Sequence, residues 1–256
     1  MTFNLDYTAA WANDIEKEKY WKNILASSVK IGQIIELKTP KISFIGIYNR
    51  QNLFKKRGAV ILLHDKAGHP NWKDVIKPLR IQLSNYGWDT LSIQMPLRKK
   101  ALKTKAEINE FYQLGFARIN SAVAYLIAKK ERVLFLIAHG SNTAIALNFA
   151  HKNQLTRVNN VKALILISSA SKKLKEHPEN TIEMLEKVKL PVLDIYGSND
   201  FDVVKSTAAQ RQAAAKRSAN IHYLQQEIHH ADHFFSNQSE ILIKRIHSWM
   251  LSTSKQ

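Results

Sequence analysis

Cysteine is absent from this chain of 256 residues, and glycine and proline are scarce, with 8 and 6 residues. The absence of cysteine excludes disulfides, zinc–thiolate sites, iron–sulfur clusters and a cysteine nucleophile. The low glycine and proline content excludes a collagen-like or linker-like chain. Hydrophobic residues make up 45% of the chain and charged residues 23%, which is typical of a globular protein with a substantial core.

Acidic residues are also scarce, because 21 Asp and Glu stand against 38 Lys and Arg and leave a formal net charge of +17. Such a charge attracts polyanions at low salt. Basic runs occur at Lys55–Arg57, Arg98–Lys100 and Lys172–Lys173. Two interpretations stay open: general solubility charge, or docking on an anionic surface such as lipid head groups, envelope polysaccharide or nucleic acid. The sequence contains no recognised nucleic-acid-binding motif.

Long hydrophobic runs are lacking as well. The N-terminus, MTFNLDYTAAW, has neither a basic start nor an apolar core, so we expect no signal peptide within this chain. The longest stretch without acidic or basic side chains is Val133–Ala150, 18 residues, which is near the length of a membrane span. Its middle, HGSNT at 139–143, would be costly in a bilayer. We therefore predict a buried strand, a sharp turn and a buried helix, and no transmembrane segment.

The hydrophobic pattern predicts one α/β domain over residues 1–256, with a helical segment at 1–28 packed on it. The opening helix is expected at Tyr7–Ala26, and two extended runs, Gln33–Leu37 and Ile42–Tyr48, indicate an antiparallel pair. Strands then alternate with helices, which implies an eight-stranded, mostly parallel sheet with helices on both faces. The expected later strands are Ala59–His64, Thr90–Met95, Val133–Ala138, Ala163–Ile167, Pro191–Tyr196 and Ile221–Leu224, and the expected helices are Trp72–Tyr86, Ile108–Leu126, Thr143–Asn153, Met184–Val188, Val203–Lys216 and Ile241–Leu251.

Four segments that follow predicted strands carry chemically useful residues, and ligands of open parallel sheets bind beyond the carboxyl ends of the strands. These segments are ILLHDKAG at 61–68, LIAHGSNTAIAL at 136–147, LDIYGSNDFD at 193–202 and HHADHFF at 229–235. Together they resemble the α/β-hydrolase superfamily. The resemblance covers about residues 31–249 and implies the α/β-hydrolase fold. Only 22 residues, 169–190, separate two later strands, so we expect no large cap domain there.

The resemblance implies a role for five residues. Gly140 stands at the apex of the nucleophile elbow, where the superfamily usually has a serine, and glycine tolerates the strained apex best. Ser141 and Asp65 correspond to the residues whose backbone N–H groups form the oxyanion hole, although Asp65 stands where glycine is usual. His233 corresponds to the catalytic base and Asp200 to the carboxylate that orients it.

Other interpretations of the last two segments stay open. Ser198, Asn199 and Asp200 are also common turn formers, and Asp202 is the less favoured candidate for the acid. The residues at 229–233 would suit either a solvated histidine-rich loop or a metal cluster, but no second segment completes a metal site. We therefore predict neither a metal nor another cofactor.

More narrowly, the chain is similar to an uncharacterised bacterial family of α/β-hydrolase-like proteins. The segments that carry this similarity are GHPNW at 68–72, LR at 79–80, GWDTLS at 87–92 and QMP at 94–96. Members of that family are commonly exported, which implies a periplasmic or secreted protein, with a cytoplasmic location left open.

Two functions follow as expectations. As an enzyme, the protein would hydrolyse a small-molecule ester or related acyl bond, with His233 acting either on Ser141 as a displaced nucleophile or directly on water. As a non-catalytic module, it would keep Asp200 and His233 as remnants and bind an anionic partner through its basic loops.

Overall fold

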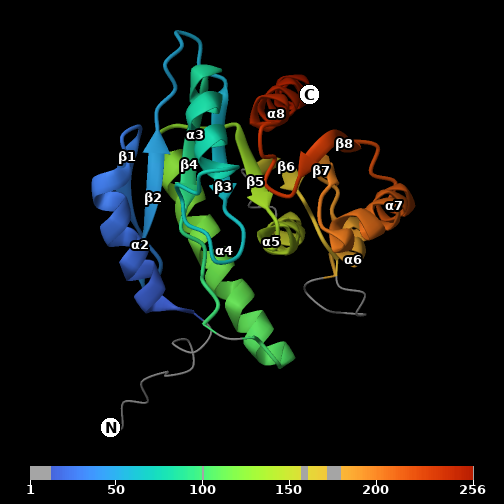
Figure 1. Ribbon diagram of the computed structural model, residues 1–256, viewed down its shortest axis with the longest axis horizontal. Helices are drawn as coiled ribbons and strands as arrows, with labels where there is room; N and C mark the ends of the chain where they lie inside the picture. The colour runs from blue at the N-terminus through green and yellow to red at the C-terminus, as the bar shows by residue number, and fades with distance from the viewer. Residues whose placement is uncertain (1–12, 100, 157–160, 172–179, 256) are drawn as a thin grey trace.

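The computed structural model describes residues 13–99, 101–156, 161–171 and 180–255. Within these residues, eight strands form one sheet in the order β1-β2-β4-β3-β5-β6-β7-β8 (Figure 1). The first two strands are antiparallel to their neighbours, and β3 to β8 all run parallel. The strands are β1 (Gln33–Lys38), β2 (Ser43–Asn49), β3 (Gly58–Leu63), β4 (Trp88–Ile93), β5 (Leu134–His139), β6 (Val161–Ile167), β7 (Val192–Asn199) and β8 (Tyr223–Asp232). The predicted mostly parallel, eight-stranded sheet is confirmed.

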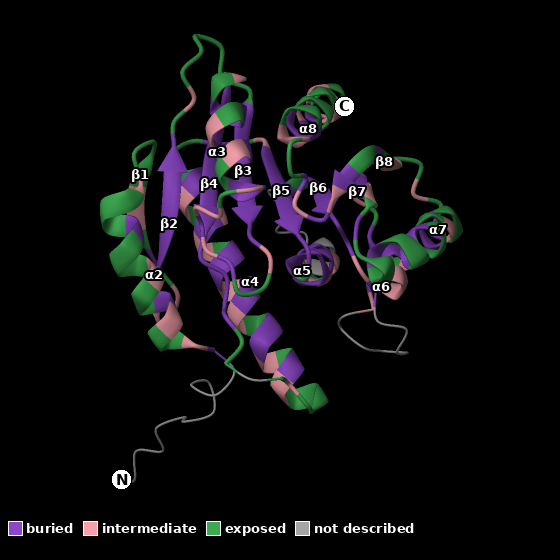
Figure 2. Cartoon of the chain, viewed as in Figure 1, coloured by how far each residue is buried: buried purple, intermediate pink, exposed green. Residues whose placement is uncertain are grey.

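Helices cover both faces of the sheet, as its composition requires. Every residue of β3, β4 and β5 is buried, so these strands need an apolar layer on each side (Figure 2). One layer includes apolar side chains of α4 and α5, and the other includes those of α3 and α8. The helices are α2 (Ile15–Ser28), α3 (Ile76–Asn85), α4 (Lys105–Ala128), α5 (Asn142–Thr156), α6 (Thr181–Lys187), α7 (Asp202–Arg217) and α8 (Ser239–Thr253).

Within the described residues, the N-terminal helix is shifted from its predicted position, because α2 begins at Ile15 and ends at Ser28, two residues beyond Ala26. We expected a helix from residue 7, and residues 7–12 lie outside the described ranges, but Asp14 is the N-cap of α2 rather than part of it. Its side chain accepts a hydrogen bond from the N–H of Lys17 (3.1 Å), which fixes the helix start at Ile15. The helix is joined to the domain by Glu18, whose two carboxylate oxygens both accept hydrogen bonds from Nη2 of the buried Arg118 (2.9 and 3.0 Å).

The last strand is longer than predicted. We expected residues 221–224, whereas β8 extends to Asp232. It is an edge strand that mixes polar, half-exposed positions with only two buried ones, Ile228 and Ala231, so its hydrophobic pattern is weak. His229 and His230 therefore lie on a strand with exposed side chains, and the polypeptide turns inward only at His233.

The long uncharged stretch forms β5, the following turn and the first part of α5, as predicted. No helix in the described part of the chain is both long and apolar enough to cross a bilayer. Between β6 and β7, the described residues form a single short helix, α6. The loops that follow β3, β4, β5 and β7 therefore meet at one end of the sheet.

Candidate active site

The turn between β5 and α5 has the sharp geometry of a nucleophile elbow. Gly140 at its apex has φ +59°, a left-handed conformation that residues with a Cβ rarely adopt. The carbonyl of Gly140 accepts a hydrogen bond from the Thr143 hydroxyl (2.7 Å), which fastens the turn to the first turn of α5. A Cβ built on Gly140 would lie 2.2 Å from Cγ of Asp65. Another side chain thus fills the space where an apex side chain would project.

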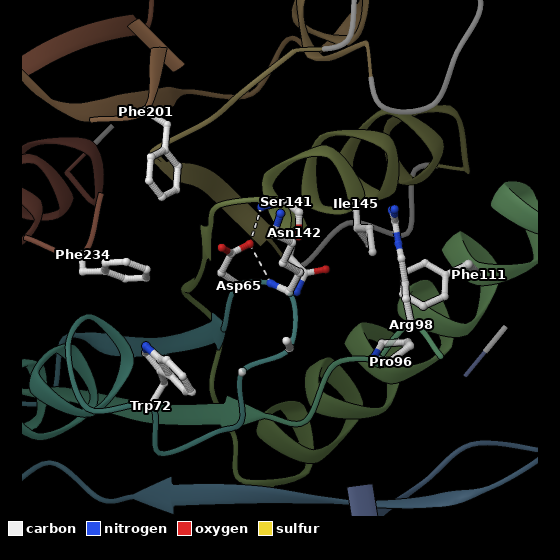
Figure 3. A pocket seen from close by; sticks show the side chains of 13 residues that line it. Asp65, Trp72, Pro96, Arg98, Phe111, Ser141, Asn142, Ile145, Phe201 and Phe234 are labelled. Carbon is white, nitrogen blue, oxygen red and sulfur yellow. Dashed lines mark hydrogen bonds between the residues drawn. The ribbon is translucent and has the colours of Figure 1, made fainter. Parts of the chain in front are cut away.

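That side chain is the Asp65 carboxylate, which comes from the loop after β3. Its Oδ1 accepts a hydrogen bond from the backbone N–H of Ser141 (2.7 Å), which Figure 3 marks, and another from the backbone N–H of Lys66 (2.6 Å). Its Oδ2 lies 3.4 Å from Nε2 of His233. One carboxylate therefore contacts both the amide donors of the elbow and the histidine.

His233 and Asp200 form a buried pair on the other side. The two side chains are 6% and 0% exposed, and Nδ1 of His233 lies 2.7 Å from Oδ1 of Asp200. Asp200 also accepts hydrogen bonds from the Ser168 hydroxyl (2.5 Å) and the N–H of Phe201 (2.8 Å). The Phe201 ring stacks on the imidazole at 4.3 Å. Asp200 and Phe201 therefore fix the plane of the His233 ring.

The two carboxylates set the charge of His233. Burial by itself would lower the pKa of His233, but the hydrogen bonds and charges of Asp200 and Asp65 outweigh burial and raise that pKa to about 9. Burial opposes ionisation of Asp65 as well, yet His233 and the two backbone amides hold its pKa well below the usual range. The resting site at neutral pH is therefore an imidazolium between two carboxylates.

Two further buried histidines support the site without contacting the pocket. His64 receives the N–H of Met95 at Nε2 (2.9 Å), so its Nδ1 carries the proton and donates it to the backbone carbonyl of Asp65 (2.7 Å). Burial lowers the pKa of His64 to about 4, which keeps the ring neutral. His139 Nε2 lies 2.9 Å from the carbonyl oxygen of His233. These contacts hold the backbones that carry the two central side chains.

A pocket of about 410 Å³ opens beside Asp65, at the carboxyl ends of β3, β4 and β5 (Figure 3). This volume lies in the range of small-molecule sites. Most of the lining is apolar or aromatic, with Lys66, Arg98, Ser141 and Asn142 as the polar additions to Asp65. The remaining residues are Ala67, Gly68, Trp72, Pro96, Phe111, Ile145, Phe201 and Phe234.

The structure brings all five residues singled out from the sequence to one place. Asp65, Asp200 and His233 contribute their side chains, and Gly140 and Ser141 contribute their backbone. The Ser141 side chain is exposed, and its N–H serves Asp65. Asp202 lies in the first turn of α7 with a fully exposed side chain near Lys205 (3.4 Å), away from the role of Asp200.

The carboxylate of Asp65 is the feature that sequence reasoning missed. The sequence suggested only that the backbone N–H of Asp65 contributes to an oxyanion hole. In the structure the Asp65 side chain instead accepts two backbone N–H groups, those of Ser141 and Lys66. The available signal lay in the resemblance, which aligns Asp65 with a usual glycine and Gly140 with a usual serine. Among the described residues, no group of three or more His, Asp or Glu side chains is placed to hold a metal ion.

The sheet order, the elbow and the ordered His–Asp pair define an α/β-hydrolase fold. Within that class, the chain belongs to the family of proteins of unknown function DUF3530, whose profile matches residues 14–110 and 100–252. No curated protein matches the sequence significantly. The predicted periplasmic or secreted location stays a prediction.

Solved structures agree with the fold. The chain is similar to Est1E from Butyrivibrio proteoclasticus, with 17% identity, a TM-score of 0.67, and coverage of 88% of this chain and 100% of that one. It is also similar to a putative dienelactone hydrolase from Klebsiella pneumoniae subsp. pneumoniae MGH 78578, with 14% identity, a TM-score of 0.66, and coverage of 86% and 98%. A third similar structure, XC6422 from Xanthomonas campestris, is described as a serine hydrolase without a lid, with 12% identity, a TM-score of 0.63, and coverage of 88% and 95%.

Proposed function

We propose that the protein is a hydrolase that works through a covalent ester on Asp65. One observation carries the proposal: the Asp65 carboxylate occupies the space into which a side chain at Gly140 would project, 2.2 Å from a Cβ built there. In that position it contacts both the elbow amide of Ser141 and the ring of His233. Carboxylates form covalent intermediates in several classes of hydrolase, so the residue type suits the position.

In the first step, Oδ2 of Asp65 attacks an electrophilic carbon of the substrate. The bond from that carbon to its leaving group breaks, and the leaving group departs with the electron pair. A basic leaving group, such as the oxygen of an opening epoxide, takes the proton of the His233 imidazolium, whereas a halide leaves as the anion and the imidazolium then loses its proton to solvent. The products are an ester on Asp65 and a neutral His233.

The second step follows from the change in charge. Once Asp65 is esterified, one of the two negative charges that raise the pKa of His233 is gone, so that pKa falls and a larger fraction of the imidazole is neutral and able to act as a base. It takes a proton from water, and the hydroxide adds to Cγ of Asp65. The resulting oxyanion forms on Oδ1, which already accepts the N–H groups of Ser141 and Lys66. The intermediate collapses by breaking the ester bond, the alcohol leaves with the carboxyl proton, and Asp65 and protonated His233 are restored.

The pocket indicates the class of substrate. Its volume of about 410 Å³ and its lining by rings such as Trp72, Phe111 and Phe234 suit a small, mainly apolar molecule. Attack by a carboxylate on a saturated carbon gives an ordinary ester, whereas attack on an ester carbonyl gives an energy-rich anhydride. We therefore infer a substrate with a saturated carbon that carries a leaving group or belongs to a strained ring.

Hydrolysis of an ester or acyl bond is the second candidate. Similar structures include Est1E with ferulic acid bound and a putative dienelactone hydrolase. For acyl chemistry, a substrate carbonyl has to displace Asp65 from the N–H of Ser141, and His233 has to lose its proton first. The resting geometry favours the covalent carboxylate over this candidate. The non-catalytic module predicted from the sequence is a further outcome of the test below.

Isotope labelling tests the proposal. The protein is incubated in H₂¹⁸O with a bromoalkane, a terminal epoxide and an activated acyl ester, and the peptide containing Asp65 is analysed by mass spectrometry. We expect Asp65 to gain ¹⁸O during turnover of the bromoalkane or epoxide. The His233→Gln variant should accumulate the alkylated peptide with the bromoalkane, because bromide leaves without a proton. Asp65→Asn abolishes both signals. Asp232→Asn is the matched control, because that neighbouring carboxylate accepts the backbone N–H groups of Phe234 and Ser236.

The other outcomes contradict the proposal in different ways. Turnover of the acyl ester alone, with a fluorophosphonate probe attached to Ser141 and activity lost in Ser141→Ala, would establish serine chemistry. No turnover, no label and no alkylated peptide with any of the three probes would leave the scaffold as a non-catalytic module.

A further inference from the structure

The loop at residues 50–57, which joins β2 to β3, projects from the end of the sheet opposite the pocket. The pocket lies at the carboxyl ends of the parallel strands, whereas this loop precedes β3 and lies beside the start of β4, since Gly58 pairs with Trp88. Figure 1 shows it extending beyond the neighbouring elements, and Figure 2 shows its tip as exposed. Whatever contacts this loop is therefore remote from Asp65.

The tip of the loop is apolar and its flanks are cationic. Phe54 is fully exposed (108%), and Leu53 is 42% exposed. Arg50, Lys55 and Arg57 surround them with exposed side chains, and the loop contains no acidic residue. Leu53 and Phe54 thus form a small exposed apolar patch with a cationic rim, an arrangement typical of contact with a membrane or another molecule.

The base of the loop is held firmly, so the tip is presented in a defined position. Asp89, which is fully buried, accepts the N–H of Gln51 (2.9 Å) and pairs with Lys56 (2.9 Å). Lys56 also pairs with the buried Glu131. Arg57 donates from Nε to the carbonyl of Tyr86 (3.0 Å). The two carboxylates at this site are thus buried and already paired with Lys56.

The connection from α4 to β5 adds further positive charge at the same end. Lys129, Lys130 and Arg132 are exposed there, and β5 starts beside β3, since Leu134 pairs with Ala59. We use the name basic end for loop 50–57 together with residues 129–132. Of the other basic runs in the sequence, Lys100 and Lys172–Lys173 lie outside the described residues.

We propose that the basic end docks on a bilayer of anionic phospholipid, with Phe54 and Leu53 inserted among the head groups. The flanking cations supply the attraction to the anionic surface, and the apolar tip leaves water at the interface. Nucleic acid would bind the same cations, but it would not bury the aliphatic side chain of Leu53 beside the Phe54 ring. A net charge of +17 strengthens the attraction in the same direction.

Vesicle binding tests this proposal with the full chain. The protein is sedimented with vesicles of phosphatidylcholine alone and of phosphatidylcholine with 30% phosphatidylglycerol. We expect binding only to the anionic vesicles, weakening as salt is raised. Phe54→Ser weakens binding about tenfold, because a large apolar side chain no longer leaves water. Lys55→Gln weakens it about fivefold, the effect of one cation near such a surface.

Two controls make the result specific to the tip. Tyr20→Ser removes another exposed aromatic side chain, 57% exposed on α2, and is expected to leave binding unchanged. Phe54→Trp is expected to show extra fluorescence quenching by brominated anionic lipid over the wild-type chain. Equal binding to both kinds of vesicle, unchanged binding of Phe54→Ser, or preference for a single-stranded oligonucleotide over anionic vesicles would overturn the proposal.

Discussion

Replacing Asp65 with asparagine isolates the electrostatic core of the proposed mechanism. The substitution keeps the shape of the side chain, and its remaining oxygen still accepts the N–H groups of Ser141 and Lys66. It removes the negative charge that lies 3.4 Å from Nε2 of His233, while Asp200 stays at 2.7 Å from Nδ1. The change therefore separates the contribution of one carboxylate from that of the other.

The size of the effect follows from the pKa of His233. A pKa of about 9 against an ordinary value of 6.5 corresponds to about 3 kcal/mol of preference for the imidazolium. A nearby opposite charge typically contributes about 1 to 3 units, and Asp65 is the more distant of the two. We expect Asp65→Asn to lower the pKa of His233 by about 1 unit, with Asp200 retaining the larger share.

An NMR titration of the imidazole Cε1–H signals measures this value directly. His233→Gln identifies the resonance among the 10 histidines, and Asp232→Asn controls for a neighbouring carboxylate that does not face the ring. A pKa of His233 that stays near 9 or rises in Asp65→Asn would show that Asp65 does not supply the charge on which the second step depends.

The same shift predicts how stability depends on pH. Because the pKa of His233 is raised in the folded state, its contribution is complete below pH 6.5 and is lost as the pH rises to about 9. Measured by urea unfolding, the wild-type chain should lose up to about 3 kcal/mol more than His233→Gln over this interval. Asp65→Asn should lose less than the wild type.

Two further substitutions test how the site and the fold are held. Gly140→Ala should lower the free energy of unfolding by at least about 2 kcal/mol, because its Cβ meets the Asp65 carboxylate and its φ of +59° is strained. Adding Asp65→Gly to the same chain should recover the part of that loss that comes from the contact. Strictly additive losses in a double-mutant cycle would contradict this. Asp194→Ala should cost about 3 to 5 kcal/mol in chemical unfolding, because it leaves the fully buried guanidinium of Arg211 without its carboxylate at 2.7 Å. Adding Arg211→Met should restore part of it, and a loss below about 1 kcal/mol would refute the reasoning.

The sequence was sufficient for the order of elements because the central strands are nearly continuous apolar runs. Such runs are typical of parallel strands buried on both faces, as in β3 and β5. The edge strand β8 was underestimated because its residues alternate weakly between polar and apolar. The start of α2 was set by a capping interaction of Asp14, which periodicity alone does not register.

The site was predictable residue by residue but not in its central contact. His233 and Asp200 stand in recognisable loops, and a buried His–Asp pair follows once β7 and β8 are adjacent. The position of the Asp65 carboxylate depends on the distance between the loop after β3 and the turn at Gly140–Ser141. Asp65 and Ser141 are 76 positions apart in the sequence. Local sequence patterns carry no information about such a distance, so the residue was assigned by its backbone alone.

The overlap between an apex side chain and the Asp65 carboxylate also limits how this chain can change over generations. A serine at position 140 would force the Asp65 carboxylate out of its present position, and, on the proposed mechanism, loss of the aspartate alone leaves the elbow with no nucleophile. A change from an aspartate nucleophile at position 65 to a serine nucleophile at position 140 therefore needs both substitutions. If they occur one at a time, the protein with a single substitution is expected to be inactive.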